Sequence, residues 1–346
     1  MMNKKEDEER LVFFKENALK QKMATVAELF KVPNNELLYK KKYATGFFRL
    51  DNIMNGGFTA GLHCIGAISS LGKSTFAMQI ANNVAKNGIP VIIFSLEMKA
   101  IDITAKAISR QTYLDTPDRP NLAKSSDMLL TESIASEFSD EELNIIKNAA
   151  EVVAKIGENI TIVECGAEPY SVEKIGQYVQ DYIKVYNKYP FIIVDYLQIL
   201  DAPDKLKSAS DKQVADYNLK RLKVLSDFFN LPIIIISSFN RENYDTEVSF
   251  KSFKDSGNIE YSCDTVIGLQ LKDVGTKGFN AEAAKSASPR NLELRLLKQR
   301  YGKTGEKIDF KFYAKYNYFE EQMLSPNEVK AKILNEIKNN DDILRY

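Results

Sequence analysis

The sequence predicts an α/β fold, with a mostly parallel central sheet flanked by helices. Three observations predict it: apolar runs recur along the chain, amphipathic helical patterns separate them, and alternating polarity replaces both near the end. The apolar runs are rich in β-branched residues and lack polar alternation, which is typical of strands buried on both faces of a parallel sheet. Six runs are expected to be strands: Leu62–Ala67, Val91–Ser95, Ile160–Glu164, Phe191–Asp195, Ile233–Ser237 and Thr265–Leu269.

Helical patterns separate these runs and carry apolar residues on one face. One pattern covers residues 74–86 and ends at Asn87-Gly88, a pair that commonly terminates helices. Ser171–Tyr186 and Gln213–Phe229 are two further examples. Alternation of buried strands with amphipathic helices favours a three-layer architecture, in which helices cover both faces of the sheet.

Two regions depart from this alternation. Residues 99–158 are expected to form a helical excursion between two strands, with a capping box at Ser139–Glu142. After residue 290, apolar and polar residues alternate on both sides of the turn Tyr301–Gly305. That pattern predicts an antiparallel hairpin at one edge of the sheet.

The chain is expected to contain one large domain between two shorter segments. Residues 1–42 are charge-rich and predict a helical arm, with a capping box at Thr25–Glu28. Residues 43–322 hold the strand–helix alternation and form the α/β domain. Residues 323–346 form a tail, whose short helix is expected to start near Ser325.

The composition is that of an ordinary globular protein and carries no overall basic charge for binding nucleic acid. Of 346 residues, 44% are hydrophobic and 27% charged, and the formal net charge is zero, so contact with nucleic acid needs a local basic patch. No apolar run approaches the length of a membrane span and the N-terminus is charged, so we expect a cytoplasmic protein with no membrane partner.

Cysteine and histidine are too sparse for the sites that they commonly build. Cys64, Cys165 and Cys263 lie far apart, which argues against a zinc site or a disulfide framework. The lone His63 offers one candidate for a Ser-His-Asp triad and is expected instead to pack within a strand.

The segment Ala67–Thr75 carries the strongest functional signal, because it lies between a predicted strand and a predicted helix. A phosphate-binding loop needs this context: a glycine lets the backbone approach an anion, and the helix N-terminus offers free N–H groups. Lys73 is then expected to reach the β- and γ-phosphates, and Ser74 to hold Mg²⁺. Ala67 stands where the usual pattern has its first glycine, so a Gly-Lys-Ser turn that opens an ordinary helix is the alternative. The predicted nucleotide-binding residues are Ser69, Ser70, Leu71, Gly72, Lys73, Ser74 and Thr75.

Three polar residues follow the C-terminal ends of buried strands, where α/β sheets bind ligands. Asp195 is placed to hold a Mg²⁺-bound water beside the phosphate loop, although capping of a strand end is the alternative. Glu97 is placed to accept a proton from an attacking water or to orient it, or simply to begin a helix. Ser238 is placed to sense the γ-phosphate, or belongs to a solvated loop.

Basic residues in three loops are candidates for contacts with other molecules. Lys298 and Arg300 precede the hairpin turn and form either a surface patch or, in a ring, a finger toward a neighbour's γ-phosphate. Two loops on the ligand edge of the sheet carry lysines that suit a nucleic-acid backbone, or form ordinary solvated surface. These lysines are Lys205, Lys207, Lys212, Lys251 and Lys254.

Taken together, these motifs resemble the C-terminal ATPase domain of DnaB-type replicative helicases, within the RecA-like superfamily of P-loop NTPases. The resemblance extends from Thr45 to Glu320. Six ordered segments carry it: Thr45–Asp51, Ala67–Ser74, Phe94–Met98, Ile193–Gln198, Asp255–Glu260 and Lys298–Gly305.

The resemblance implies an ATP hydrolase, a DNA helicase or translocase that moves on single-stranded DNA during replication. It implies that Lys73 and Ser74 bind the phosphates of ATP and Mg²⁺. Asp195 becomes the Walker B acid, and Glu97 the catalytic base.

Further implications concern other molecules. The resemblance implies that Lys298 and Arg300 act in trans between subunits of a homo-oligomeric ring, a hexamer in this family. It implies that the loops after Asp195 and after Arg241 line a channel that grips single-stranded DNA. A helicase loader or primase is a further implied partner.

The chain departs from the family pattern in two respects. Ser238 replaces the glutamine of a Ser-Gln-Leu-Asn-Arg segment, and a shorter side chain is expected to weaken or reroute γ-phosphate sensing. The family's N-terminal helical collar has no counterpart, because residues 1–42 supply only an arm. Two alternatives therefore stay open: a RecA-like DNA-dependent ATPase in recombination, repair or loading, and a regulatory module that binds ATP.

Overall fold

The structure is a computed structural model that describes residues 31, 40–165, 170–201, 206, 208–240, 245–253 and 258–324. The chain divides into two compact units, Met1–Lys41 and Lys42–Tyr346, and nearly all described residues belong to the second. The capping box predicted at Thr25–Glu28 and the tail helix predicted near Ser325 lie outside the described residues. The proposed domain limits at residues 42 and 322 stay predictions.

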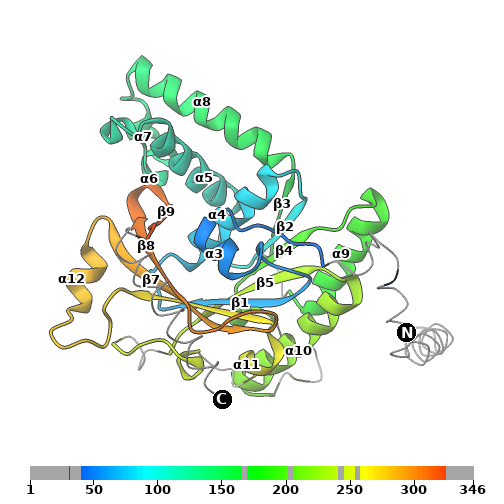
Figure 1. Cartoon of the computed structure of the whole chain (residues 1–346). Coiled ribbons are helices and arrows are strands. Elements are labelled where there is room, and N and C mark those ends of the chain that lie inside the picture. Colours follow the sequence, from blue (N-terminus) through cyan, green and yellow to red (C-terminus); the bar gives the residue numbers. More distant parts are fainter. Residues whose placement is uncertain are drawn as a thin grey trace. The chain divides into compact units, whose positions relative to one another are not determined.

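The described strands form one sheet in the order β3-β2-β4-β5-β1-β6-β7-β8-β9 (Figure 1). Pairing is parallel from β3 to β6 and antiparallel from β6 to β9, which confirms the predicted mostly parallel sheet with an antiparallel edge. The parallel strands are β1 (Gly61–Ala67), β2 (Val91–Ser95), β3 (Ile160–Glu164), β4 (Phe191–Asp195), β5 (Pro232–Ser238) and β6 (Thr265–Leu271). The antiparallel strands are β7 (Arg290–Gln299), β8 (Lys307–Tyr313) and β9 (Tyr318–Glu321).

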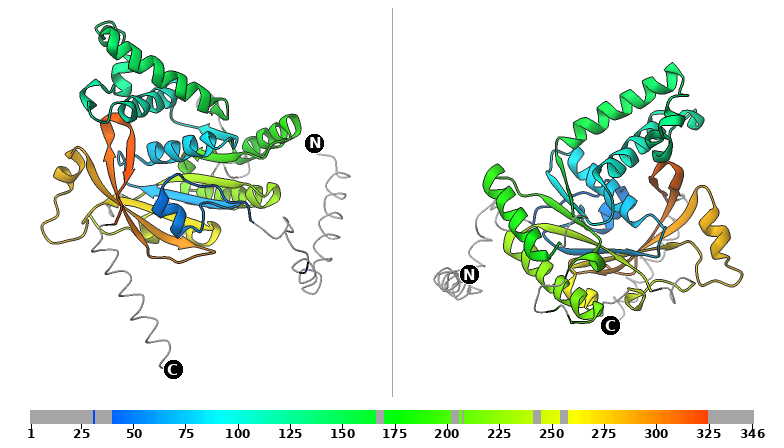
Figure 2. Two further views of the ribbon diagram at one scale, coloured as in Figure 1. Left: turned by 45° about the horizontal axis from the view of Figure 1, so that its top comes forward. Right: turned by 180° about the vertical axis from the view of Figure 1, so that it is seen from behind.

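Helices cover both faces of the sheet, as the alternating pattern predicts (Figures 1 and 2). The helix α4 (Lys73–Lys86) lies on one face, and α9 (Val172–Tyr186) and α10 (Asp211–Phe229) lie on the other. Right-handed crossovers require this split, because β1 leads toward β2 in one direction across the sheet while β4 leads toward β5 in the other. Short helices α3 (Phe48–Ile53), α11 (Ile259–Ser262) and α12 (Ala281–Ser286) complete the domain.

The helical excursion between β2 and β3 is confirmed. It contains α5 (Ala100–Asp115), α6 (Ser126–Leu130), α7 (Glu132–Ala135) and α8 (Asp140–Gly157). Ser139 and Glu142 form the expected capping box, with the Ser139 hydroxyl accepting from the Glu142 N–H. The excursion packs against the antiparallel edge, where the Tyr113 and Tyr316 rings stack with centroids 4.7 Å apart.

Aromatic packing joins α4 to the antiparallel edge. Phe76 of α4 is fully buried and lies 5.5 Å from the Phe310 ring and 5.1 Å from the Phe319 ring, measured between centroids. The strand β9, which contributes Phe319, was not predicted, because four residues are too few to show a period. The antiparallel edge therefore packs directly beneath the helix that begins at Lys73.

His63 is a packed strand residue, as predicted. It is 1% exposed, and its Nε2 lies 2.8 Å from the carbonyl oxygen of Thr59. Burial lowers the pKa of His63 to about 4. Within the described part of the chain, no helix is long and apolar enough to span a membrane, and no cluster of three metal-ligating side chains occurs.

Candidate functional site

The loop between β1 and α4 has the backbone of a phosphate-binding loop. Gly72 immediately precedes α4 and has φ +90° and ψ +23°, in the left-handed region. A Cβ atom at this position would lie 2.8 Å from the Phe312 ring and 2.9 Å from the Phe319 ring. Both the conformation and the space therefore require glycine at this position. The N-terminus of α4, the kind of site that binds anions, directly follows it.

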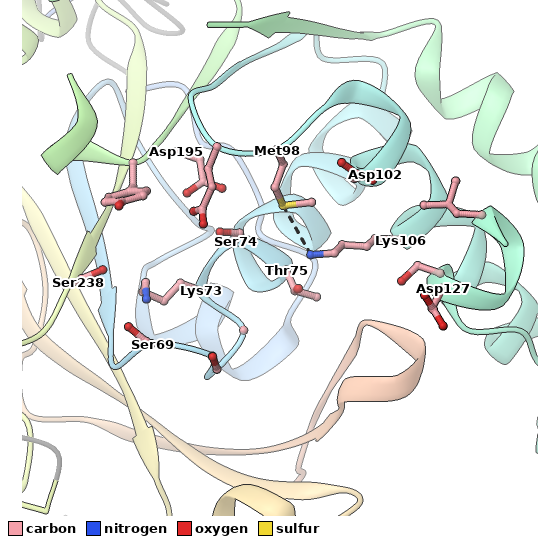
Figure 3. Close-up of a pocket in the computed structure, with 16 residues that line it drawn as sticks. Ser69, Lys73, Ser74, Thr75, Met98, Asp102, Lys106, Asp127, Asp195 and Ser238 are labelled. Atoms are coloured by element: carbon pink, nitrogen blue, oxygen red, sulfur yellow. Dashed lines mark hydrogen bonds between the residues drawn. The ribbon is translucent and has the colours of Figure 1, made fainter. Parts of the chain in front are cut away.

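A cavity of about 700 Å³ opens above this loop (Figure 3). Of the predicted nucleotide-binding residues, Ser69, Ser70, Gly72, Lys73, Ser74 and Thr75 line it. Leu71 does not line the cavity, because its apolar side chain is 1% exposed and belongs to the hydrophobic core, and its part in nucleotide binding stays a prediction. The Nζ of Lys73 donates to the carbonyl oxygen of Ile68 at 3.2 Å, so the lysine folds back across the mouth of its own loop.

Asp195, the last residue of β4, lies beside Ser74 in the cavity (Figure 3). It is 1% exposed, and neither carboxylate oxygen meets the geometry of a hydrogen bond with any described residue. Burial raises the pKa of Asp195 to about 6, against lowering contributions from Ser74, Lys73 and Lys106. A buried carboxylate without hydrogen bonds, beside a serine hydroxyl, has the oxygen donors that Mg²⁺ prefers.

Glu97 and Ser238 complete the polar rim of the cavity. Glu97 follows β2 and is exposed, whereas Ser238 ends β5 and is partly buried. Ser238 pairs in register with Ala67, at the end of β1. The preceding Ser237 accepts a hydrogen bond of 2.9 Å from the Gln198 side-chain amide. Four strand ends, β1, β2, β4 and β5, thus bring the predicted residues to one edge of the sheet.

Sequence analysis missed Lys106, which reaches the cavity from α5 (Figure 3). Its Nζ lies 3.5 Å from the Met98 sulfur. Burial lowers the pKa of Lys106, while the charges of Asp195, Asp102 and Glu97 act to raise it. Nothing in the local sequence marks this lysine, because the packing of α5 beside α4 brings it to the site. Asp102 and, from α6, Ser126 and Asp127 also line the cavity.

Lys298 and Arg300 lie at the N-terminal ends of the parallel strands, whereas the cavity lies at their C-terminal ends. Because β7 runs antiparallel to β6, its end lies where β6 begins, whereas Lys73 lies beyond the end of β1. The Arg300 guanidinium donates to the Asp264 carboxylate at 2.7 Å, and Lys298 donates to the Glu260 carbonyl oxygen. Neither residue lines the cavity of its own chain.

The predicted DNA-contacting lysines are described only in part. Lys212, at the start of α10, and Lys251, after β5, are both exposed. Lys205, Lys207 and Lys254 lie outside the described residues. Their role stays a prediction.

The glycine-containing loop at the end of β1 and the buried acid at the end of β4 have the arrangement of a P-loop NTPase with the RecA-like fold. The DnaB-like helicase C terminal domain matches residues 43–321, and the chain belongs to this family. It is 26% identical over 328 residues to a probable replicative DNA helicase of Trieres chinensis, covering 91% of this chain and 67% of that protein. It is also 26% identical over 278 residues to the replicative DNA helicase DnaB of Treponema pallidum, covering 80% of this chain and 55% of that one.

Solved structures agree on the fold. A solved ATPase domain superposes with a TM-score of 0.69 at 22% identity, covering 89% of this chain and 98% of that one. A DnaB-like replicative helicase, described with its interactions with primase, superposes with a TM-score of 0.68 at 21% identity, covering 86% of this chain and 65% of that one. The chain spans between about a third and two thirds of the length of the curated relatives that it matches.

Proposed function

We propose that this chain is an ATP-driven DNA helicase or translocase that hydrolyses ATP between the subunits of a hexameric ring. One observation carries the proposal: the charged groups that this chemistry needs are divided between two edges of one sheet. The cavity edge holds Lys73, Asp195 and Glu97, while Lys298 and Arg300 stand at the other. Two copies arranged head to tail bring the two sets together.

Lys73 and the N–H groups at the start of α4 are proposed to bind the phosphates of ATP. Ser74 and Asp195 are the residues that would hold Mg²⁺, which neutralises phosphate charge when bound. The residues fit this ion, because the Asp195 carboxylate is buried without hydrogen bonds among the described residues and lies beside Ser74. Lys106 supplies a further positive charge at the same place.

Hydrolysis requires a water to attack the γ-phosphorus while the bond to the bridging oxygen of ADP breaks. Glu97 is proposed to orient that water and accept its proton, which leaves inorganic phosphate and ADP. Ser238 is proposed to report the presence of the γ-phosphate to the strand β5 and the loop after it. Lys298 and Arg300 of the neighbouring subunit are proposed to stabilise charge on the transferring phosphoryl group.

Single-stranded DNA is the proposed second ligand. Lys212 and Lys251 are exposed in the connections that follow β4 and β5, the strands that end at Asp195 and Ser238. Movement of these connections with the state of the nucleotide would couple hydrolysis to the grip on a phosphate backbone. Contact with a helicase loader or primase is part of the same proposal, by analogy with relatives.

The test is ATP hydrolysis with and without single-stranded DNA, with Lys73→Ala as the blank. Strong stimulation by DNA supports a motor, and directional displacement on a forked duplex then separates a helicase from an ATPase that only binds DNA. A slow rate that DNA leaves unchanged contradicts the proposal and favours a regulatory module.

A further inference from the structure

Arg290, the first residue of β7, contacts the phosphate-binding loop from outside the cavity. Its Nη1 donates to the carbonyl oxygen of Ser70 at 2.9 Å. Ser70 has φ +62°, in the left-handed region that residues with a side chain seldom adopt. The hydrogen bond therefore acts on a turn whose backbone conformation needs support.

Phe312 supports the same loop from the neighbouring strand. Arg290 and Phe312 are partners across the β7–β8 pair, and the guanidinium carbon lies 5.8 Å from the centre of the ring. The ring fills the space that a Cβ on Gly72 would occupy. Two residues that face each other across the antiparallel edge thus hold two neighbouring positions of the loop, Ser70 and Gly72.

Local stability does not account for the arginine. Its Nε is buried and has no hydrogen-bond partner among the described residues. An unpaired buried donor costs free energy, so an apolar side chain of similar length is expected to fold at least as well here. The guanidinium charge, in contrast, adds to the positive potential of a loop that has to bind an anion.

We infer that Arg290 is a positioning residue of the phosphate-binding loop, fixing the Ser70 turn so that the N–H groups that follow are preorganised for phosphates. The inference rests on the proposed binding of ATP. The strand β7 would then take part in two ATP sites. Arg290 at its start supports the loop of its own subunit, and Arg300, which directly follows its end, is proposed to act on the neighbouring subunit. One strand would then connect successive ATP sites of the ring.

Three variants of the full chain test this role. Arg290→Met keeps the length of the side chain but removes its charge and donors, and Arg290→Lys keeps the charge. Lys277→Met is the matched control, because Lys277 is an exposed cation in the connection that leads from β6 to β7. Each variant is compared with the wild type by hydrogen exchange of residues 69–74, by melting temperature and by affinity for a fluorescent ATP analogue with Mg²⁺.

Arg290→Met is expected to speed exchange at residues 69–74 without lowering the melting temperature. Nucleotide binding should weaken about threefold to tenfold, the factor that one net hydrogen bond supplies. The KM for ATP should rise with kcat unchanged, because the interaction is made before and during the reaction alike. Arg290→Lys should fall between Arg290→Met and the wild type, and Lys277→Met should match the wild type.

Unchanged exchange and affinity in Arg290→Met overturn the inference, as does an equal loss of affinity in Lys277→Met, which would reveal a general effect of charge. If Arg290→Met does not fold, Arg290→Gln replaces it with the same expectations. Failure of the wild type to bind nucleotide contradicts the proposed function instead, and the exchange comparison still decides the role of Arg290.

Discussion

Two buried aspartates lie at opposite ends of the parallel strands, and their pKa values are shifted in opposite directions. At the C-terminal edge, Asp195 has no hydrogen bond from a described residue, and burial raises its pKa to about 6. At the N-terminal edge, Asp264 is nearly as buried, but it accepts from Lys223 and Arg300 at 2.7 Å each and from the Leu62 N–H at 3.0 Å. Burial acts to raise the pKa of Asp264, but Lys223 and the Leu62 N–H outweigh it, so the pKa is lowered.

The contrast separates a carboxylate whose charge is paired within the chain from one whose charge is paired only in part. Asp264 ties β6, α10 and the end of β7 together, and its charge is compensated within the chain. Asp195 is compensated only in part, by Ser74 and by the charges of Lys73 and Lys106, so burial still raises its pKa. We propose that this carboxylate binds Mg²⁺. The Arg300 side chain is still 49% exposed although it pairs with Asp264, so it remains accessible to a second copy of the chain.

The largest expected effect concerns the N-terminal edge. Arg300→Ala should lower kcat for ATP hydrolysis by about 10³-fold or more, while binding of ATP is retained, because a trans arginine acts on charge that develops in the transition state. Steady-state hydrolysis and nucleotide affinity check this. Arg300→Lys is the control for the lost ion pair, because it keeps a positive charge near Asp264. It separates a loss of activity caused by destabilisation of the fold from a loss caused by removal of the guanidinium that acts in trans. Full activity in a folded Arg300→Ala protein would contradict the trans assignment.

Lys73→Ala should have the next largest effect. Loss of the loop lysine is expected to reduce hydrolysis by at least about 100-fold, because it removes a preorganised charge from the phosphates. Unlike Arg300→Ala, it should also weaken ATP binding, which equilibrium titration measures. The two variants are therefore expected to differ: Lys73→Ala should lose ATP binding as well as hydrolysis, whereas Arg300→Ala should lose hydrolysis alone.

Asp195→Asn should stabilise the protein without nucleotide. The folded-state pKa of about 6 lies above the ordinary value of 3.8, so the folded chain holds this proton more tightly than the unfolded chain does. The resulting stability is present below pH 3.8 and is lost as pH rises through 6. At pH 8 the variant should therefore be more stable by about 1 to 3 kcal/mol.

Denaturant unfolding at several pH values checks this expectation. The advantage of Asp195→Asn should stay constant well above pH 6 and shrink as pH falls through 6 toward 4. Asp127→Asn is the control, because Asp127 lines the same cavity but is exposed. An Asp195→Asn protein less stable than wild type at pH 8 would show that the carboxylate is compensated, and the contrast with Asp264 would fail.

A smaller effect is expected from the loop that follows β4. Lys205→Ala combined with Lys207→Ala should weaken binding of single-stranded DNA and flatten its dependence on salt, by about 0.7 in the log–log slope for each phosphate that is no longer neutralised. Titration of a labelled oligonucleotide at several salt concentrations measures this. Lys277→Ala combined with Lys315→Ala removes two exposed charges elsewhere and should leave the slope unchanged. An unchanged slope in the first pair would move the DNA site to another surface.

The smallest effect is expected at Ser238. Ser238→Gln restores the longer side chain of the family pattern and should increase stimulation of hydrolysis by DNA by at most about threefold to tenfold, the factor of one added hydrogen bond. Hydrolysis with and without DNA checks it, with Ser238→Ala as the counterpart that removes the hydroxyl. Equal stimulation in all three proteins would mean that this position does not link the nucleotide to DNA.

The sheet was predictable because burial on both faces leaves uninterrupted apolar runs. The bounds of β2, β3 and β4 agree with the predicted runs, and β1, β5 and β6 differ only by extensions of one or two residues at their ends. The strand β9 could not be found in this way, because its four residues pair only after β7 and β8 are in place.

The site was predictable where a motif fixes the backbone, and not where packing brings residues together. Gly72, Lys73 and Ser74 belong to one loop, and Asp195 ends an apolar run. Lys106 reaches the cavity only through the position of α5, and Arg290 reaches Ser70 across 220 residues of sequence. Leu71 lies within the predicted loop, but its apolar side chain turns into the core.

The central claim is that each ATP site is built from the cavity edge of one subunit and the opposite edge of its neighbour. Its most direct test mixes Arg300→Ala subunits with Lys73→Ala subunits, dissociates the rings and lets them reassemble. If sites are shared, an intact pair forms wherever Lys73 of the first variant meets Arg300 of the second, and hydrolysis recovers toward about a quarter of the wild-type rate at equal mixing. The double variant mixed with either single variant should stay inactive. Mixed rings with no recovery, although they assemble and bind ATP, would contradict the account.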